Sequence, residues 1–236
     1  KITGDTPPTA VVAIGNSITS AGVKSIAIGS AAGAAGLNTI ALGAGVAAAG
    51  DYAVALGSGA KATGINTIAI GKAAAVSAGT GSIAIGGLVT NTDGLSNILM
   101  GESITNTTGS ENILIGKSIK NLGGSKNVVM GANAAVALAA GQVVIGNYAA
   151  SAGIGSVAIG NIATADAGGS VSIGDGAGTG GFGAIAIGNA AAAGAGAGTI
   201  VIGNKAYALA GTNQIVLGNV ASATGTSTIS IGDNTV

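Results

Sequence analysis

The sequence contains no cysteine, histidine, arginine or tryptophan, and it has only four aromatic residues. Without cysteine, neither disulfides nor thiolate metal sites can stabilise the fold. Without histidine, cysteine and arginine, most catalytic arrangements are excluded, and the eight acidic residues are scattered over predicted turns. We therefore expect no enzymatic activity, no cofactor and no bound metal.

Charge is also scarce, because charged residues make up 7% of the chain and the formal net charge is zero. Binding of nucleic acid or of an anionic membrane surface requires clustered basic residues. The densest basic group, Lys117, Lys120 and Lys126, is interpreted as solvated turn residues. We therefore expect no nucleic-acid partner. The most hydrophobic window, 184–203, is rich in glycine and alanine and carries the internal repeat described below, so we expect no membrane contact by this chain itself.

What the sequence does contain is a repeat. An apolar triplet followed by glycine, as in Ile26-Ala27-Ile28-Gly29, recurs along the whole chain. We call the final glycine of each unit the anchor glycine, and the stretch from one anchor to the next a coil. Coils have one of two lengths: a 14-residue coil runs from Gly15 to Gly29, and a 15-residue coil runs from Gly71 to Gly86. The sixteen anchors are Gly15, Gly29, Gly43, Gly57, Gly71, Gly86, Gly101, Gly116, Gly131, Gly146, Gly160, Gly174, Gly188, Gly203, Gly218 and Gly232.

Each coil also has an apolar residue three positions after the anchor and usually a second glycine seven or eight positions after it. A helix is disfavoured because glycine returns about every seven residues and because the triplets are rich in β-branched residues. The pattern instead predicts strand, turn, strand, turn in every coil. We therefore expect an all-β chain, a parallel solenoid of about sixteen coils over residues 11–236, preceded by a lead-in segment at residues 1–10.

The middle residue of the triplet points to the opposite face from its two neighbours. It is nearly always apolar, so both faces of this strand are expected to be buried, one inside the coil and one against another chain. We assign the middle position to the contact with other chains. Its bulkiest members are Leu99, Leu114, Val129, Val144, Val201 and Val216.

These six residues occur only in the longer coils. Six of the seven 15-residue coils have one of them at the middle of the triplet, whereas the middle residue of every 14-residue coil is alanine or serine. We hypothesise that the extra residue of the 15-residue coil, inserted near the second turn, moves the strand away from the partner chains, and that the bulkier side chain fills the gap.

Asparagine forms two ranks at coil spacing. Such ranks are typical of stacked amide ladders, which reinforce parallel strands. We favour this structural role over ligand binding. One rank lies four residues before successive anchors and comprises Asn97, Asn112 and Asn127, followed by Gln142; the other lies five residues after the anchor and comprises Asn91, Asn106 and Asn121.

Known ligand motifs are incomplete. Gly116-Lys117-Ser118 lacks the earlier glycine of a phosphate-binding loop, because that position is Glu111. The loose dinucleotide pattern at 153–158 recurs elsewhere, as expected from the glycine and alanine content. The aspartates of calcium-binding turns and the threonine ranks of ice-binding faces are missing or sparse.

The units at Ser25–Ser30 and Ser156–Asn161 resemble the head repeats of YadA-type trimeric autotransporter adhesins, and the similarity covers about Val11 to Asp233. This resemblance implies a left-handed parallel β-roll that assembles as a homotrimer. The left hand comes only from the resemblance, since crossovers in ordinary parallel sheets are right-handed. It also implies display on the outer membrane of a Gram-negative bacterium, with the head exposed extracellularly.

The function implied by the resemblance is adhesion to host extracellular matrix, cells or surfaces. In the family, a repeat of this kind has been associated with binding collagen. The matching core here is Ser156, Val157, Ala158, Ile159 and Gly160, with Gly155 in place of the leading asparagine. The alternative is the receptor-binding module of a phage tail fibre or spike, built on the same trimeric β-roll. A solenoid glycosidase would need paired carboxylates in a groove, and the spacing of the acidic residues does not offer such a pair.

Overall fold

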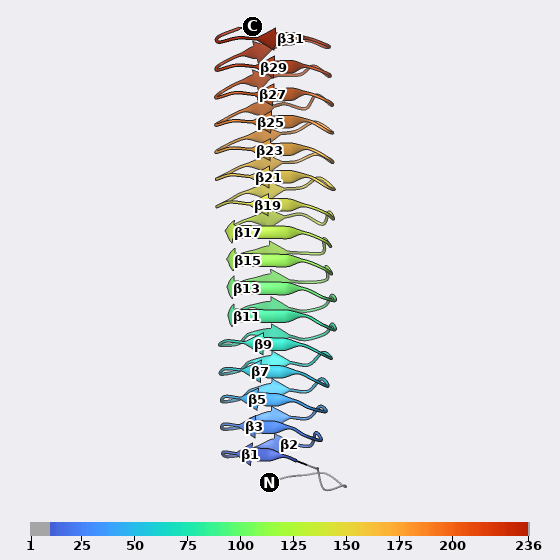
Figure 1. Cartoon of the computed structure of the whole chain (residues 1–236), viewed down its shortest axis with the longest axis vertical. Helices are drawn as coiled ribbons and strands as arrows, with labels where there is room; N and C mark the ends of the chain where they lie inside the picture. Colours follow the sequence, from blue (N-terminus) through green and yellow to red (C-terminus); the bar gives the residue numbers. More distant parts are fainter. Residues whose placement is uncertain (1–9, 236) are drawn as a thin grey trace. The chain divides into compact units, whose positions relative to one another are not determined.

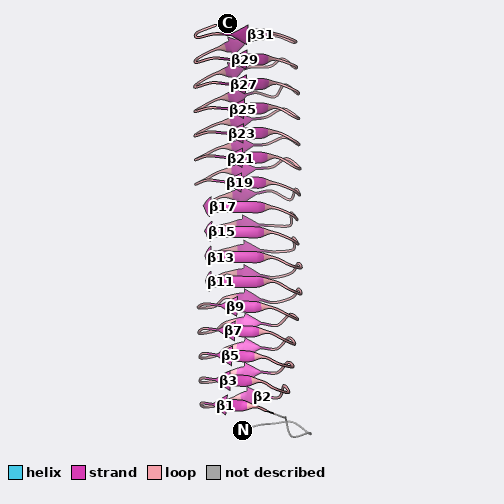
Figure 2. Cartoon of the chain, viewed as in Figure 1, coloured by secondary structure: helices cyan, strands magenta, loops and turns pink. Residues whose placement is uncertain are grey.

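The computed structural model describes residues 10–235, and the chain divides into two compact units after Ser118. Every regular element among these residues is a β-strand (Figure 2). The described part contains no helix long and apolar enough to cross a membrane. The expected lead-in segment lies, except for Ala10, outside the described residues.

In the first unit, eight triplet strands alternate with seven two-residue strands, each set forming one parallel sheet (Figure 1). The triplet strands are β1 (Val12–Ile14), β3 (Ile26–Ile28), β5 (Ile40–Leu42), β7 (Val54–Leu56), β9 (Ile68–Ile70), β11 (Ile83–Gly87), β13 (Ile98–Glu102) and β15 (Ile113–Lys117). The short strands are β2 (Thr19–Ser20), β4 (Gly33–Ala34), β6 (Ala47–Ala48), β8 (Lys61–Ala62), β10 (Ala75–Val76), β12 (Thr90–Asn91) and β14 (Thr105–Asn106).

The second unit is built in the same way, with eight strands of each kind. The triplet strands are β17 (Val128–Ala132), β19 (Val143–Ile145), β21 (Val157–Ile159), β23 (Val171–Ile173), β25 (Ile185–Ile187), β27 (Ile200–Ile202), β29 (Ile215–Leu217) and β31 (Ile229–Ile231). The short strands are β16 (Lys120–Asn121), β18 (Ala135–Val136), β20 (Ala150–Ser151), β22 (Thr164–Ala165), β24 (Gly178–Thr179), β26 (Ala192–Ala193), β28 (Tyr207–Ala208) and β30 (Ser222–Ala223).

Within each unit the strands pair one coil apart. Ala27 pairs with Ala41 in a 14-residue coil, and Leu99 pairs with Leu114 in a 15-residue coil. All sixteen predicted triplets form strands, and residues 10–235 make about 15 turns. The parallel β-solenoid predicted from the repeat is therefore confirmed.

The anchor glycines are required by the stacking of coils. Gly29 has φ of +135°, a conformation that side chains rarely adopt, and a Cβ at this position would lie 2.1 Å from the carbonyl oxygen of Gly43, the next anchor. The same close approach recurs from Gly101 to Gly116, at 1.7 Å. Glycine at the anchor therefore lets the backbones of successive coils come into contact.

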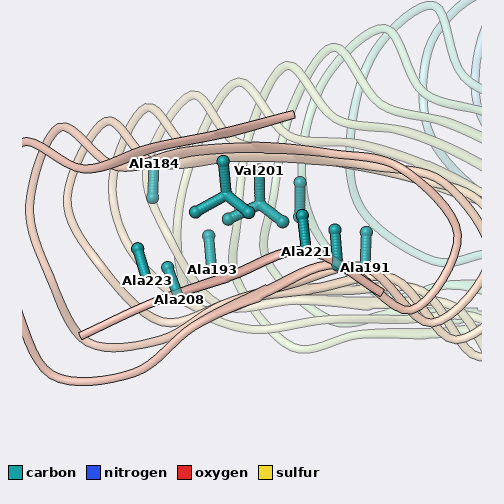
Figure 3. Close-up of a cluster of buried hydrophobic side chains, with 10 residues drawn as sticks. Ala184, Ala191, Ala193, Val201, Ala208, Ala221 and Ala223 are labelled. Atoms are coloured by element: carbon teal, nitrogen blue, oxygen red, sulfur yellow. The ribbon is translucent and has the colours of Figure 1, made fainter. Parts of the chain in front are cut away.

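The interior of each coil is narrow and is filled from two sides. The triplet side supplies the residues two and four positions before the anchor, and the short-strand side supplies those three and five positions after it. Figure 3 shows this in the second unit, where Ala184 and Val201 point toward Ala193, Ala208 and Ala223. These side chains are at most 2% exposed.

The interior position of the middle triplet residue corrects the sequence analysis. Except for Ala13 in the first strand, side chains at this position are buried in a single chain, so they pack within their own coil and cannot contact another chain. The coil is too narrow to hold two bulky residues per triplet strand, so the two flanking residues point outward. The six residues assigned to packing between chains, Leu99, Leu114, Val129, Val144, Val201 and Val216, are all interior.

Polar interior residues bond to the second turn or to each other. In 14-residue coils a hydroxyl four positions before the anchor donates to a carbonyl three residues earlier, as Thr39 does to Gly36 at 3.0 Å and Ser25 does to Gly22 at 2.7 Å. Hydrogen bonds of this local kind satisfy backbone groups that the turn leaves unpaired.

The asparagine ranks form the predicted ladders. Within the first unit, Asn112 Nδ2 donates to Asn97 Oδ1 at 3.1 Å, and Asn106 Nδ2 donates to Asn91 Oδ1 at 2.6 Å. In the second unit the backbone N–H of Gln142 donates to Asn127 Oδ1 at 2.9 Å. All these side chains are fully buried, so the asparagine ranks have a structural role, as expected.

Candidate functional site

The main exposed apolar feature is the outer face of the triplet strands. We define the triplet face of each unit as the first and third residues of its triplet strands. Every one is Ile, Val, Leu or Met, and none is buried in the single chain. Ile28 is 36% exposed, Met100 41% and Ile231 65%. Because successive triplet strands are in register, these residues form two continuous apolar columns in each unit.

The segment from Ser156 to Gly160 is divided between the interior and the surface. Ser156 and Ala158 are fully buried, and the Ser156 hydroxyl donates to the carbonyl of Gly153 at 2.6 Å. Val157 and Ile159 are half-buried on the triplet face, and Gly160 lies at the turn that follows. Only Val157, Ile159 and Gly160 are thus available for contact with another molecule.

A second surface feature, which sequence reasoning missed, is a row of polar side chains directly after the anchors of the second unit. Asn161 Nδ2 donates to Asp175 Oδ1 at 2.7 Å, and Asn204 Nδ2 donates to Asn219 Oδ1 at 3.0 Å. The members of the row lie at the surface. The signal in the sequence was the repeated Gly-Asn or Gly-Asp pair. The row comprises Asn147, Asn161, Asp175, Asn189, Asn204, Asn219 and Asp233.

At the same position in the first unit lies an ion pair, Lys117 Nζ to Glu102 Oε2, at 3.1 Å. Both side chains are more than half exposed, so the pair contributes about 1 kcal/mol or less to stability. The densest basic group of the sequence thus includes a residue paired on the surface.

All four aromatic residues are exposed: Tyr52 by 53%, Tyr148 by 57%, Phe182 by 72% and Tyr207 by 39%. None of them contributes to the interior, which the narrow coil reserves for smaller side chains. Aromatic residues are enriched at the energetically important points of binding surfaces. These four side chains are therefore candidates for contact with a partner.

Residues 10–235 contain no enclosed pocket and no group of three residues able to hold a metal ion. The surface of each unit instead consists of repeated, shallow features: the triplet face, the turns and the short-strand face. We define the short-strand face as the first residues of the short strands, all of which except Ser222 are at least partly exposed. An arrangement of this kind can bind another extended surface through many similar contacts.

A family model described as the YadA head domain repeat (2 copies) matches residues 20–45, 48–74 and 151–177. Each match covers about two of the coils described above, and the third includes Ser156 to Gly160. A search of curated proteins finds no match to the chain. The matched repeats lie within the coils of the parallel β-solenoid, so the family model and the observed fold agree.

Proposed function

We propose that this chain, a YadA-like adhesin head built of that family's repeats, acts as a homotrimer. The homotrimer attaches a bacterial cell to host matrix, cells or surfaces. The family is a structural adhesin fold, and the role proposed here is binding without catalysis. The observation that carries the proposal is the triplet face, an apolar surface repeated on every coil.

The triplet face supports assembly with further copies of the chain. Exposed apolar patches on soluble monomers rarely exceed a few hundred Å². The two columns of Ile, Val, Leu and Met along each unit form a larger exposed apolar area than such a patch. Burial of this area between chains would be strongly favourable. The number of three chains and the left-handed coil are taken from the family.

Burial of the triplet face restricts where a receptor can bind. Val157 and Ile159 would lie between chains, so the segment from Ser156 to Gly160 would support receptor binding by holding the neighbouring surface in place. The receptor, a matrix protein such as collagen, would contact the short-strand face and the turns. Weak contacts on three chains would then add through avidity.

Display on the outer membrane of a Gram-negative bacterium, with the head outside the cell, follows from the same family. The chain needs no cofactor for this role, because adhesion depends on repeated surface contacts. No observation on residues 10–235 favours the phage fibre over the adhesin.

The assembly is tested by sedimentation equilibrium of the purified chain and two variants. Leu56→Asp places a charge on the triplet face, whereas Ser58→Asp places the same charge on an exposed turn of the neighbouring coil. We expect a trimer for the parent and for Ser58→Asp, and dissociation for Leu56→Asp because an unpaired charge would be buried between chains. A folded parent monomer at micromolar concentration would refute the proposal.

Adhesion is tested by surface plasmon resonance on immobilised collagen and by attachment of bacteria that display the chain. We expect the trimer to bind more tightly than dissociated Leu56→Asp chains, because avidity is lost on dissociation. Equal binding by trimer and monomer, or no attachment to any host matrix protein or cell, would contradict the proposed function.

A further inference from the structure

The polar row of the second unit is ordered by its own hydrogen bonds. Asn147 Nδ2 donates to Asn161 Oδ1 at 3.4 Å, and Asn161 Nδ2 donates to Asp175 Oδ1 at 2.7 Å. From the other side, Asn189 Nδ2 donates to Asp175 Oδ2 at 3.4 Å. The Asp175 carboxylate thus accepts from the coils on both sides, and four surface side chains are held in line at the spacing of parallel strands, about 4.8 Å.

These side chains keep hydrogen-bonding capacity for a ligand. An amide has two N–H donors and two acceptor lone pairs, and a carboxylate has about four acceptor sites. The bonds within the row use only part of this capacity, and the side chains lie at the surface. Because the row is already ordered, its side chains lose less conformational entropy when a ligand binds.

An aromatic residue directly follows the first residue of the row in the sequence. Tyr148 follows Asn147 directly, is 57% exposed and has φ of +54°; Ile162 follows Asn161, is 55% exposed and has φ of +56°. Positive φ recurs two residues after every anchor and is unfavourable for large and especially for β-branched residues, so Tyr148 and Ile162 occupy this position at a conformational cost. Other coils place alanine or serine at this position, as at Ala31 and Ser17, so the fold does not require bulky residues there.

We propose that Tyr148, Asn147, Asn161, Asp175 and Asn189 form a binding strip for a neutral, linear glycan. A sugar ring presents an apolar face that can stack on tyrosine and hydroxyl groups that can both donate and accept hydrogen bonds. Sugar rings in an extended glycan also repeat at a length comparable to the strand spacing. Asp175 disfavours polyanions, and the strip itself contains no cation. This proposal rests on the proposed function, because it names a substrate class for the adhesin surface.

The strip is shallow, so binding is expected to be weak for a single site and to be strengthened in the trimer. The probes are soluble cellohexaose and chitohexaose, titrated into the purified chain and followed by isothermal calorimetry and side-chain amide NMR. We expect saturable binding of at least one probe, with shifts in the amide signals of Asn147, Asn161 and Asn189. Absence of binding to both probes would overturn the proposal.

Three variants locate the site. Tyr148→Ala and Asn161→Ala should each weaken glycan binding by about fivefold or more, as for central contact residues. Alanine already occupies both positions in other coils, at Ala31 and Ala44, so the variants are expected to fold. The matched control is Tyr52→Ala, which removes an equally exposed tyrosine from the first unit and should leave affinity unchanged. A loss of affinity in Tyr52→Ala as large as that in Tyr148→Ala would refute the assignment.

Two further measurements separate this proposal from the proposed function. Heparin, a polyanion, should bind the chain more weakly than the neutral glycan, and the reverse order would overturn the glycan class. If the trimer attaches to collagen but binds no glycan, the strip is refuted and the adhesin function stands. If glycan binds and is lost in Tyr148→Ala while no trimer or attachment is found, the strip is supported and the proposed function is refuted.

Discussion

Two regions of the first unit differ in coil length and in what the coil encloses. The stretch from Gly15 to Gly71 is built of 14-residue coils, and its interior holds mainly Ala with Ser or Thr near the second turn. The stretch from Gly71 to Gly116 is built of 15-residue coils, and its interior holds Leu, Ile, Val and Asn besides Ala74, Ser82 and Ala84. The extra residue lies in the second turn, so a longer turn accompanies a larger interior.

The second unit follows the same rule. The 15-residue coils enclose Val144, Val201 and Val216 at the middle of the triplet, whereas the 14-residue coils enclose alanine or serine there, as at Ala158 and Ser172. Coil length therefore sets interior volume, and side-chain volume follows it, as close packing requires. The correlation seen in the sequence is real, but the bulky residue fills its own coil and not a gap between chains.

Two details sharpen the rule. Ala84 is the small middle residue of a 15-residue coil, and Val76 from the facing short strand occupies the same interior. Ile18 and Val46 are the large apolar exceptions among the 14-residue coils, and each faces an alanine at the middle of the triplet, Ala27 and Ala55. The volume is thus shared between the two sides of a coil.

The largest effect is expected for Leu114→Ala, which empties the interior of a 15-residue coil. Leu114 is fully buried, so the variant should lose about 2–5 kcal/mol of unfolding free energy. Urea unfolding followed by far-UV circular dichroism measures the loss. The matched control is Leu122→Ala, because Leu122 is 57% exposed and its truncation should cost about 0.5 kcal/mol or less. Equal losses in the two variants would contradict the interior assignment.

A smaller loss is expected for Asn112→Ala, which breaks an amide ladder found only in the 15-residue coils. The substitution removes the donor that Asn112 Nδ2 provides to Asn97 Oδ1, so we expect a loss of about 1–3 kcal/mol. A double-mutant cycle with Asn97→Ala should give a coupling energy of about 0.5–3 kcal/mol. Zero coupling in urea unfolding would show that the ladder does not stabilise these coils.

Overfilling a short coil tests the rule from the other direction. Ala27→Leu should destabilise its 14-residue coil by about 1–3 kcal/mol, because Ala27 is fully buried and Ile18 already occupies the same interior. A glycine inserted between Gly22 and Val23 converts this stretch into a 15-residue coil and should restore part of the loss. If the insertion restores nothing in thermal unfolding, coil length does not set interior volume.

The smallest effect is a gain in stability from Ile162→Asn. Ile162 has φ of +56° and is 55% exposed, whereas asparagine tolerates this conformation and occupies the same position at Asn133. The expected gain is up to about 1 kcal/mol, measured as a rise in the urea midpoint at constant slope. The matched control is Ala190→Asn at the same position two coils further along the chain, where less strain is relieved and a smaller gain is expected. A lower midpoint in Ile162→Asn would show that the isoleucine side chain contributes more than its strain costs.

Much of the fold could be predicted because the repeat carries local physical constraints. Glycine returns wherever the backbones of successive coils touch, as at Gly29 and Gly43, so the anchors and the strands before them are visible in the sequence. The amide ladders were predictable too, since Asn97 and Asn112 recur at coil spacing. The polar row at Asn147 and Asn161 was equally visible as repeated Gly-Asn pairs, but its exposure was not.

By itself the sequence determined the period, the strands, their register and the two alternating faces of each triplet, because these depend on spacing and on steric demands within one coil. It left open which face of the triplet lies inside, since alternation is symmetric between the two faces. Only the tertiary structure decided this, because the distance between the two sides of a coil admits Ala27 or Leu114 but no pair of flanking Ile residues. That same distance turns the flanking residues outward and leaves an apolar face exposed on the single chain.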